Sequence, residues 1–224
     1  MTYAELREHF PHLFINPENC PIHIAETEQQ QRNVKEQNHL RAREQGIPDE
    51  WTTTGIVLED AYATIIRDPV IFSDGSTGTY LRILEKPQNT CGVAIIPIFK
   101  DKIVLLQHFR HALRSLHIEI PRGYGSVGQP SVQTATKELS EEIGAQYDEI
   151  IYLGSMLWNS GLSDGKTDLF LSYLNHIDFS IRVEGITNIS LFSVKEVEEM
   201  IVNDTINDSF TITCFMKARL KGLI

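Results

Sequence analysis

Three glutamates in this sequence, Glu138, Glu141 and Glu142, are spaced so that an α-helix would place them on one side. Like charges at this spacing repel one another by about 0.2–0.5 kcal/mol per pair on an isolated helix. A hard divalent cation would offset the repulsion, because it binds carboxylate oxygens and keeps waters that substrate phosphates can replace. A solvated acidic surface is the alternative. The adjoining glycine-rich segment, Pro121 to Gly125, favours the metal, because its backbone can bring carbonyl groups close to a cation.

The segment from residue 131 to residue 143 is predicted to be the helix that carries these glutamates. Ser131 is expected to cap its N-terminus and Gly144 to end it in the left-handed conformation. A buried stripe at helical spacing is expected to consist of Val132, Ala135, Leu139 and Ile143. The glutamates would then project from a helix whose other side is anchored in the core.

The stretch from Gly123 to Ala145 resembles the Nudix box, in which a glycine precedes a helix with Arg-Glu and Glu-Glu pairs. The matching residues are Gly123, Glu138, Leu139, Glu141, Glu142 and Gly144, with Ala145 as a weaker match. By this resemblance the three glutamates are metal ligands and catalytic residues, and the carbonyl group of Arg122 is a further ligand. The implied cofactor is Mg²⁺, with Mn²⁺ as the alternative.

Two positions depart from the box. Gln129 stands where the family has its first glutamate, and Lys137 stands where it has arginine. The family's two residues usually pair, and Gln with Lys can still hydrogen-bond without the bidentate geometry of guanidinium and carboxylate. Paired change at paired positions indicates accommodation, so we expect activity that is slower or directed to a different substrate.

From about Thr53 to its end, the chain is similar to the ADP-ribose pyrophosphatase branch of the family. Leu106 to Arg110 resembles the branch's Gln-Tyr-Arg strand end, so Arg110 is expected to contact the substrate diphosphate, with a surface salt bridge as the alternative. His117 to Gly123 resembles the branch's Glu-Leu-Pro-Ala-Gly segment. Within it, Glu119 either fixes the metal loop or pairs with a neighbouring arginine.

The loop from Asn159 to Gly165 resembles a loop of the same branch that ends in Ser-Asp-Glu. This loop carries the general base in several relatives, and Gly165 stands in place of that glutamate here. Asp164 is therefore the first candidate for the base, with Asp168 or a glutamate of the box as the alternatives.

Composition limits the function classes. The 224 residues are 42% hydrophobic, enough for a core without disulfide bonds. Twenty Lys and Arg against 30 Asp and Glu give a net charge of −10, which argues against a nucleic-acid polymer as partner but permits a small nucleotide. The three cysteines have no metal or redox spacing, which favours a cytoplasmic location. Neither a signal peptide nor membrane association is expected.

The chain is predicted to have three regions: a polar, largely helical arm over residues 1–50, an N-terminal β region over 51–88, and a catalytic domain over 89–224. Strands and helices that follow no regular βαβ repeat predict an α/β fold of the α+β type. The expected architecture is a Nudix-like α/β/α sandwich around a mixed sheet, with a small N-terminal β region. Helices are also expected at 194–202 and 210–220, and a hairpin at Lys100-Asp101.

A homodimer is expected from the N-terminal β region. Apolar runs at 65–66 and 70–72 break strict alternation, so both faces of that segment need cover. In the branch, the corresponding segment packs across a twofold axis and completes the partner's active site, which implies an isologous interface here. Arg67 or Arg82 would then bind substrate in the partner subunit or form a salt bridge at the rim.

The predicted function is metal-dependent hydrolysis of the diphosphate linkage of a nucleoside diphosphate derivative. ADP-ribose is the first candidate substrate, and attack of an activated water on phosphorus would give AMP and ribose 5-phosphate. A Nudix enzyme for GDP-mannose or a dinucleotide coenzyme is one alternative. A nucleotide-sugar sensor that does not hydrolyse is another, and Gln129, Lys137 and Gly165 keep it open.

Overall fold

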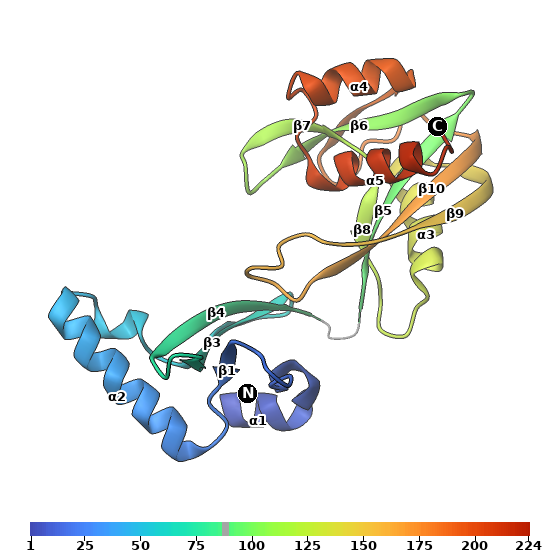
Figure 1. The fold of residues 1–224 in the computed structure, drawn as a ribbon. Helices are drawn as coiled ribbons and strands as arrows, with labels where there is room; N and C mark the ends of the chain where they lie inside the picture. Colours follow the sequence, from blue (N-terminus) through green and yellow to red (C-terminus); the bar gives the residue numbers. More distant parts are fainter. Residues whose placement is uncertain (87–89) are drawn as a thin grey trace. The chain divides into compact units, whose positions relative to one another are not determined.

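The computed structural model describes residues 1–86 and 90–224, which divide into two compact units (Figure 1). The N-terminal unit comprises Met1–Gln88 together with Gly161–Asp164, and the C-terminal unit comprises Asn89–Ser160 and Gly165–Ile224. No helix among the described residues is long and apolar enough to cross a membrane.

The N-terminal unit is built on a four-stranded antiparallel sheet in which β3 pairs with all three other strands. Its strands are β1 (Ile22–Ile24), β2 (Gly55–Glu59), β3 (Ala63–Phe72) and β4 (Thr77–Glu85). Its helices are α1 (Tyr3–His9), α2 (Glu28–Gln45) and two 3₁₀ turns, Pro11–Phe14 and Asp49–Trp51. The long central strand alternates between more and less buried positions over its first half, as a strand with two unequal faces does.

Residues 1–50 contribute to the core of this unit as well as to its surface. Leu6 and Phe14 pack with Ile66 of β3 and Leu84 of β4. The buried residues of α2 are Val34, Asn38 and Ala42, which recur every fourth position on an otherwise polar helix. Such a narrow stripe is enough to seat a surface helix, because only one side of it needs apolar contact.

The C-terminal unit contains a mixed sheet of seven strands. The order is β11 (Ile186–Phe192), β6 (Lys102–Arg110), β5 (Gly92–Phe99), β10 (Lys166–His176) and β9 (Gln146–Leu157), while β7 (Ser115–Glu119) pairs with β6 and β8 (Arg122–Tyr124) with β5. β5 and β10 are parallel, and the other pairs are antiparallel. The predicted α+β class with a mixed sheet is confirmed.

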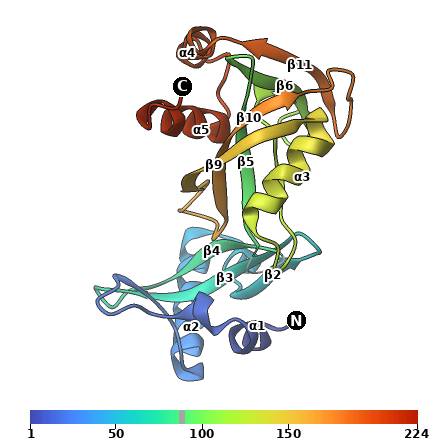
Figure 2. The same cartoon turned by 90° about the vertical axis from the view of Figure 1, so that its right-hand side faces the viewer.

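Helices lie on both faces of this sheet (Figure 2): α3 (Ser131–Ile143) on one, α4 (Val194–Val202) and α5 (Ser209–Leu220) on the other. β5 shows the arrangement residue by residue. Val93 and Ile95 pack in the core with α3, whereas Ala94 and Ile96 pack in the core with α4 and α5. A strand buried on both faces requires a continuous apolar run, which is what its sequence has.

The ends of α3 correct one detail of the prediction. Pro130 occupies the N-cap position, so the predicted cap by Ser131 is wrong, because the extended backbone of the proline immediately precedes the first helical residue. Gly144 ends the helix with a φ of 57°, as predicted. Leu139 is fully buried, but Val132 in the first turn is 39% exposed.

Because the two side chains differ in burial, replacing each by alanine should lower the free energy of unfolding by different amounts. Leu139→Ala should lower the free energy of unfolding by about 2–5 kcal/mol, because it leaves a cavity in the core. Val132→Ala should change it by no more than about 0.5 kcal/mol. Urea denaturation of both variants measures the two effects, and equal losses would contradict the assigned buried face.

Candidate functional site

Gly123 and Glu138 are in direct contact between β8 and α3. A Cβ atom on Gly123 would lie 2.1–2.4 Å from the carboxylate atoms of Glu138, far inside any real contact distance. The position therefore has no room for another residue while Glu138 keeps its place. The absence of a side chain lets the backbone of the loop approach the acidic helix.

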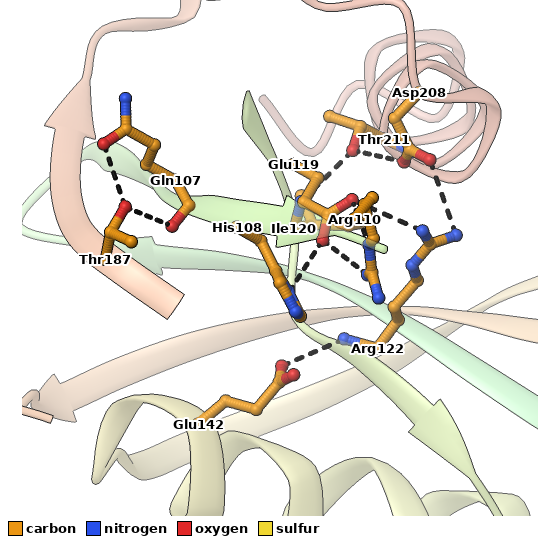
Figure 3. A network of polar contacts seen from close by, with 10 residues as sticks. All are labelled: Gln107, His108, Arg110, Glu119, Ile120, Arg122, Glu142, Thr187, Asp208 and Thr211. Atoms are coloured by element: carbon orange, nitrogen blue, oxygen red, sulfur yellow. Dashed lines mark hydrogen bonds and ion pairs between the residues drawn. The ribbon is translucent and has the colours of Figure 1, made fainter. Parts of the chain in front are cut away.

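The carboxylate of Glu142 lies against the same segment. Glu142 is 3% exposed, and its Oε2 accepts the backbone N–H of Arg122 at 3.1 Å (Figure 3). Burial, followed by the charge of Glu138, raises the pKa of Glu142 to about 8, although the Arg122 N–H acts in the opposite direction. The carboxyl group therefore keeps its proton at neutral pH in the protein without metal.

Glu138 shares this electrostatic environment. Burial raises its pKa, and the charges of Glu141 and Glu184 act in the same direction, while Lys137 opposes them. Sequence reasoning missed Glu184, which precedes β11 and has a positive φ of 50°. Glu184 lies outside the stretch that matches the box. The sequence therefore gives no spacing from which its closeness to α3 could be inferred.

Glu141 is arranged differently from its two neighbours. Its Oε2 lies 3.1 Å from Nζ of Lys137, and the two side chains are 55% and 57% exposed. The sequence suggested Gln129 as a partner of Lys137, and the ion pair that the structure describes is with Glu141. Lysine carries a compact charge on a flexible stem, so it reaches the carboxylate one turn away.

The carboxylates fit a hard divalent cation in part. Glu138 and Glu142 supply oxygens on successive turns beside the backbone of Arg122, and Mg²⁺ and Mn²⁺ prefer such oxygens. Within residues 1–86 and 90–224, no three His, Cys, Asp or Glu side chains are gathered as a metal site. The structure thus brings two of the three predicted carboxylate ligands together and pairs the third with Lys137.

A buried ion cluster centred on Glu119 lies beside this loop (Figure 3). Glu119 is 1% exposed and accepts a hydrogen bond from Nε of Arg110 at 3.0 Å. Nη2 of Arg122 and Nδ1 of His108 lie 3.3 and 3.0 Å from its two oxygens. Both roles considered for Glu119 are therefore present, because it pairs with Arg110 and also holds the residue that precedes Gly123.

His108 was missed by the sequence analysis. Burial lowers its pKa, and the charge of Arg110 reinforces the effect, so the ring is neutral at neutral pH. The period of two along β6 places His108 on the same face as Arg110. That periodicity is the signal that could have identified it.

The candidate bases each have a partner. Asp164 lies in the N-terminal unit, where its Oδ1 accepts the N–H of Glu85 at 3.0 Å and its own N–H donates to Ile83. Asp168 lies in the C-terminal unit, where it accepts the hydroxyl of Tyr152 at 3.2 Å and lies 3.5 Å from Nζ of Lys166. A role as base would require either carboxylate to accept a proton in addition to these contacts.

The two arginines expected at a shared site bind within the N-terminal unit. Nη1 of Arg67 donates to the carbonyl groups of Thr53 and Glu50 at 2.9 and 3.3 Å. Arg82 pairs with Asp68, which is 1% exposed, and donates to the carbonyl of Leu13 at 2.8 Å. The contacts with Glu50, Thr53 and Leu13 hold the sheet to segments that precede it, while the pair of Arg82 with Asp68 joins β4 to β3.

Known proteins match part of the chain in sequence and most of it in fold. No protein-family model matches. The chain is 28% identical to the ADP compounds hydrolase NudE of Escherichia coli (strain K12) over 82 residues, 37% of this chain and 43% of that protein. It is 32% identical to the methanol dehydrogenase activator of Bacillus methanolicus over 81 residues, 36% of this chain and 44% of that protein. The matches span less than half of either relative.

A crystal structure of an ADP compounds hydrolase superposes with a TM-score of 0.66, at 19% identity, over 76% of this chain and 93% of that chain. The fold is that of a Nudix hydrolase. The predicted resemblance to the Nudix family and its ADP-ribose pyrophosphatase branch is confirmed. In this fold, β8 with Gly123 and α3 with its glutamates lie next to each other.

The raised pKa of Glu142 predicts a pH dependence of stability in the metal-free protein. Between the ordinary pKa of 4.5 and about 8, the folded state binds more protons than the unfolded state. The free energy of unfolding should therefore fall as the pH rises through this window. Thermal melts from pH 5 to pH 8 in a chelator should show a smaller decrease for Glu142→Gln, and an equal decrease would contradict the assigned burial.

Proposed function

We propose that this chain hydrolyses the diphosphate linkage of a nucleoside diphosphate derivative, with ADP-ribose as the first candidate and Mg²⁺ or Mn²⁺ as cofactor. The observation that carries the proposal is the placement of the Glu138 and Glu142 carboxylates against the backbone of Arg122 and Gly123. The partial match to a hydrolase of ADP compounds supports the substrate class.

In this proposal the metal is held by Glu138, Glu142 and the carbonyl of Arg122, with Glu141 as a further ligand once it leaves Lys137. The cation, when bound, supplies neutralisation of phosphate charge and activation of water. Arg110 contacts a substrate phosphate, and Glu119 orients its guanidinium group from behind. Asp164 remains the first candidate for the base, with Asp168 or a glutamate of the box as the alternatives.

A nucleotide sensor that does not hydrolyse is the second candidate. Two observations favour it: the ion pair of Lys137 with Glu141 engages one predicted ligand, and one of the partial matches is named as an activator of another enzyme. Such a protein would bind the nucleotide and leave its diphosphate intact.

Assays of the purified protein separate these candidates. With Mg²⁺ or Mn²⁺ we expect release of AMP from ADP-ribose, compared with GDP-mannose and a dinucleotide coenzyme on the same panel. Glu142→Gln should lower turnover about a hundredfold or more, because it removes a charged ligand of the cation. Glu199→Gln, which changes an exposed helix glutamate paired with Lys195, is the matched control. Binding without turnover of any compound would favour the sensor.

We also propose that the protein forms a homodimer through the N-terminal sheet. Two exposed apolar side chains, Leu58 of β2 and Leu81 of β4, lie opposite Ile65 and Arg67 of β3 and therefore project from one face of the sheet; they are 48% and 37% exposed. Such a pair on a small sheet is typical of an interface between subunits.

Light scattering tests the assembly. The wild-type protein should have twice the mass of the chain at micromolar concentration, and Leu58→Lys with Leu81→Lys should shift it to the monomer, because burying two unpaired charges disfavours association. Leu220→Lys on α5, at a position that is 80% exposed, is the control. A wild-type monomer that turns over substrate would contradict both the dimer and any shared site.

A further inference from the structure

The segment Ile120–Arg122, which leads into Gly123, is bound by the first turn of α5. The hydroxyl of Thr211, a fully buried residue of that turn, accepts the backbone N–H of Ile120 at 3.1 Å (Figure 3). Because the N–H of Ile120 is removed from water, this hydroxyl is what satisfies it. The contact fixes the start of the segment to a helix that is distant in sequence.

Asp208, the N-cap residue of α5, binds both Thr211 and Arg122. Its Oδ2 accepts the N–H and the hydroxyl of Thr211 at 2.8 and 2.7 Å, which caps the helix. Its Oδ1 lies 3.4 Å from Nη1 of Arg122. The guanidinium carbon of Arg122 also lies 4.4 Å from the ring centroid of Phe210, within the range of a cation–π contact.

The opposite side of Arg122 faces the acidic site. Its Nη2 contacts the buried Glu119, and its backbone N–H donates to Glu142. The carbonyl of Pro121, the residue before it, accepts the N–H of Ile95 on β5 at 3.0 Å. Arg122 is therefore held from two directions: α5 contacts its side chain, while Glu119 contacts its side chain and Glu142 its backbone N–H. An alanine at this position would make none of the side-chain contacts.

We propose that the first turn of α5 is a positioning element of the acidic site, in which Asp208, Phe210 and Thr211 hold Ile120–Arg122 so that the backbone of Arg122 stays against Glu142. The part that concerns the metal rests on the proposed function. Residues behind metal ligands commonly set the orientation of those ligands, and their loss lowers metal affinity by about 10–100-fold. Here α5, the C-terminal helix, would support the segment that lies against the glutamates of α3.

Asp208→Asn is the informative variant, because the amide oxygen can still cap α5 while the charge opposite Arg122 is lost. Thr211→Ser keeps the hydroxyl group, and Thr211→Val removes it. Ser193→Ala is the matched control, because Ser193 caps α4 on the same face of the sheet through Glu196 and has no contact with Ile120–Arg122 among the described residues.

Two measurements apply to each variant. Amide hydrogen exchange at Ile120 and Arg122 should accelerate in Asp208→Asn and Thr211→Val, and should match the wild type in Thr211→Ser and Ser193→Ala. Mn²⁺ affinity can be measured by electron paramagnetic resonance. If the segment supports the metal site, Asp208→Asn should bind Mn²⁺ about tenfold or more weakly than the wild type. In Asp208→Asn the Mg²⁺ concentration that gives the half-maximal rate should also rise, while kcat at saturating Mg²⁺ stays within about twofold of the wild-type value. A loss of folded protein would lower kcat instead.

Wild-type exchange rates at both amides in Asp208→Asn would overturn the proposal. Faster exchange with unchanged Mn²⁺ affinity would also overturn it, because the helix would then serve the fold alone. If the wild-type protein binds no Mn²⁺, the proposed function fails, and the exchange rates still decide whether α5 holds the segment. If Thr211→Val does not fold, Asp208→Asn against Ser193→Ala gives the same decision.

Discussion

A carboxylate with 1% exposure, that of Glu119, must be surrounded by cations and donors, because a charge taken out of water is otherwise strongly unfavourable. Arg110 from β6 and Arg122 from β8 supply the charge, and the neutral His108 fills the remaining side. Because Glu119 needs these partners, the end of β6, the end of β7 and the start of β8 lie close together. The backbone that meets Glu142 is a continuation of this cluster, so its geometry depends on the burial of Glu119.

The sequence predicted best where the signal is local. The helix expected at 194–202 has those bounds in the structure, where Ser193 and Glu196 form a capping box at its start. The hairpin expected at Lys100-Asp101 is present, and both residues have the positive φ that a two-residue turn of this kind needs. The box places Gly123 and Glu138 in one stretch of chain, and the structure shows the two residues in contact.

Contacts between distant segments could not be predicted. Nothing in the spacing of Asp164 indicates that its carboxylate accepts the N–H of Glu85, 79 residues earlier. The pairing of β1 with β3 was missed because a three-residue strand has too few positions to show a period. Family spacing drew attention to Gln129 as a partner of Lys137 and gave no indication of the ion pair with Glu141, which depends on side-chain reach along the helix.

The parallel pairing of β5 with β10 has a consequence for the order of folding. Gly92 lies opposite Thr167, so the chain between them, which includes β6, β7, β8 and α3, forms a loop that the pair closes. Closing so long a loop is entropically unfavourable before the contacts that compensate for it exist, and pairings of this kind slow folding. The β6–β7 hairpin can form early from neighbouring residues. Because the core against which α3 packs includes residues of both β5 and β10, we expect that core to be completed only after the two ends of the loop have met.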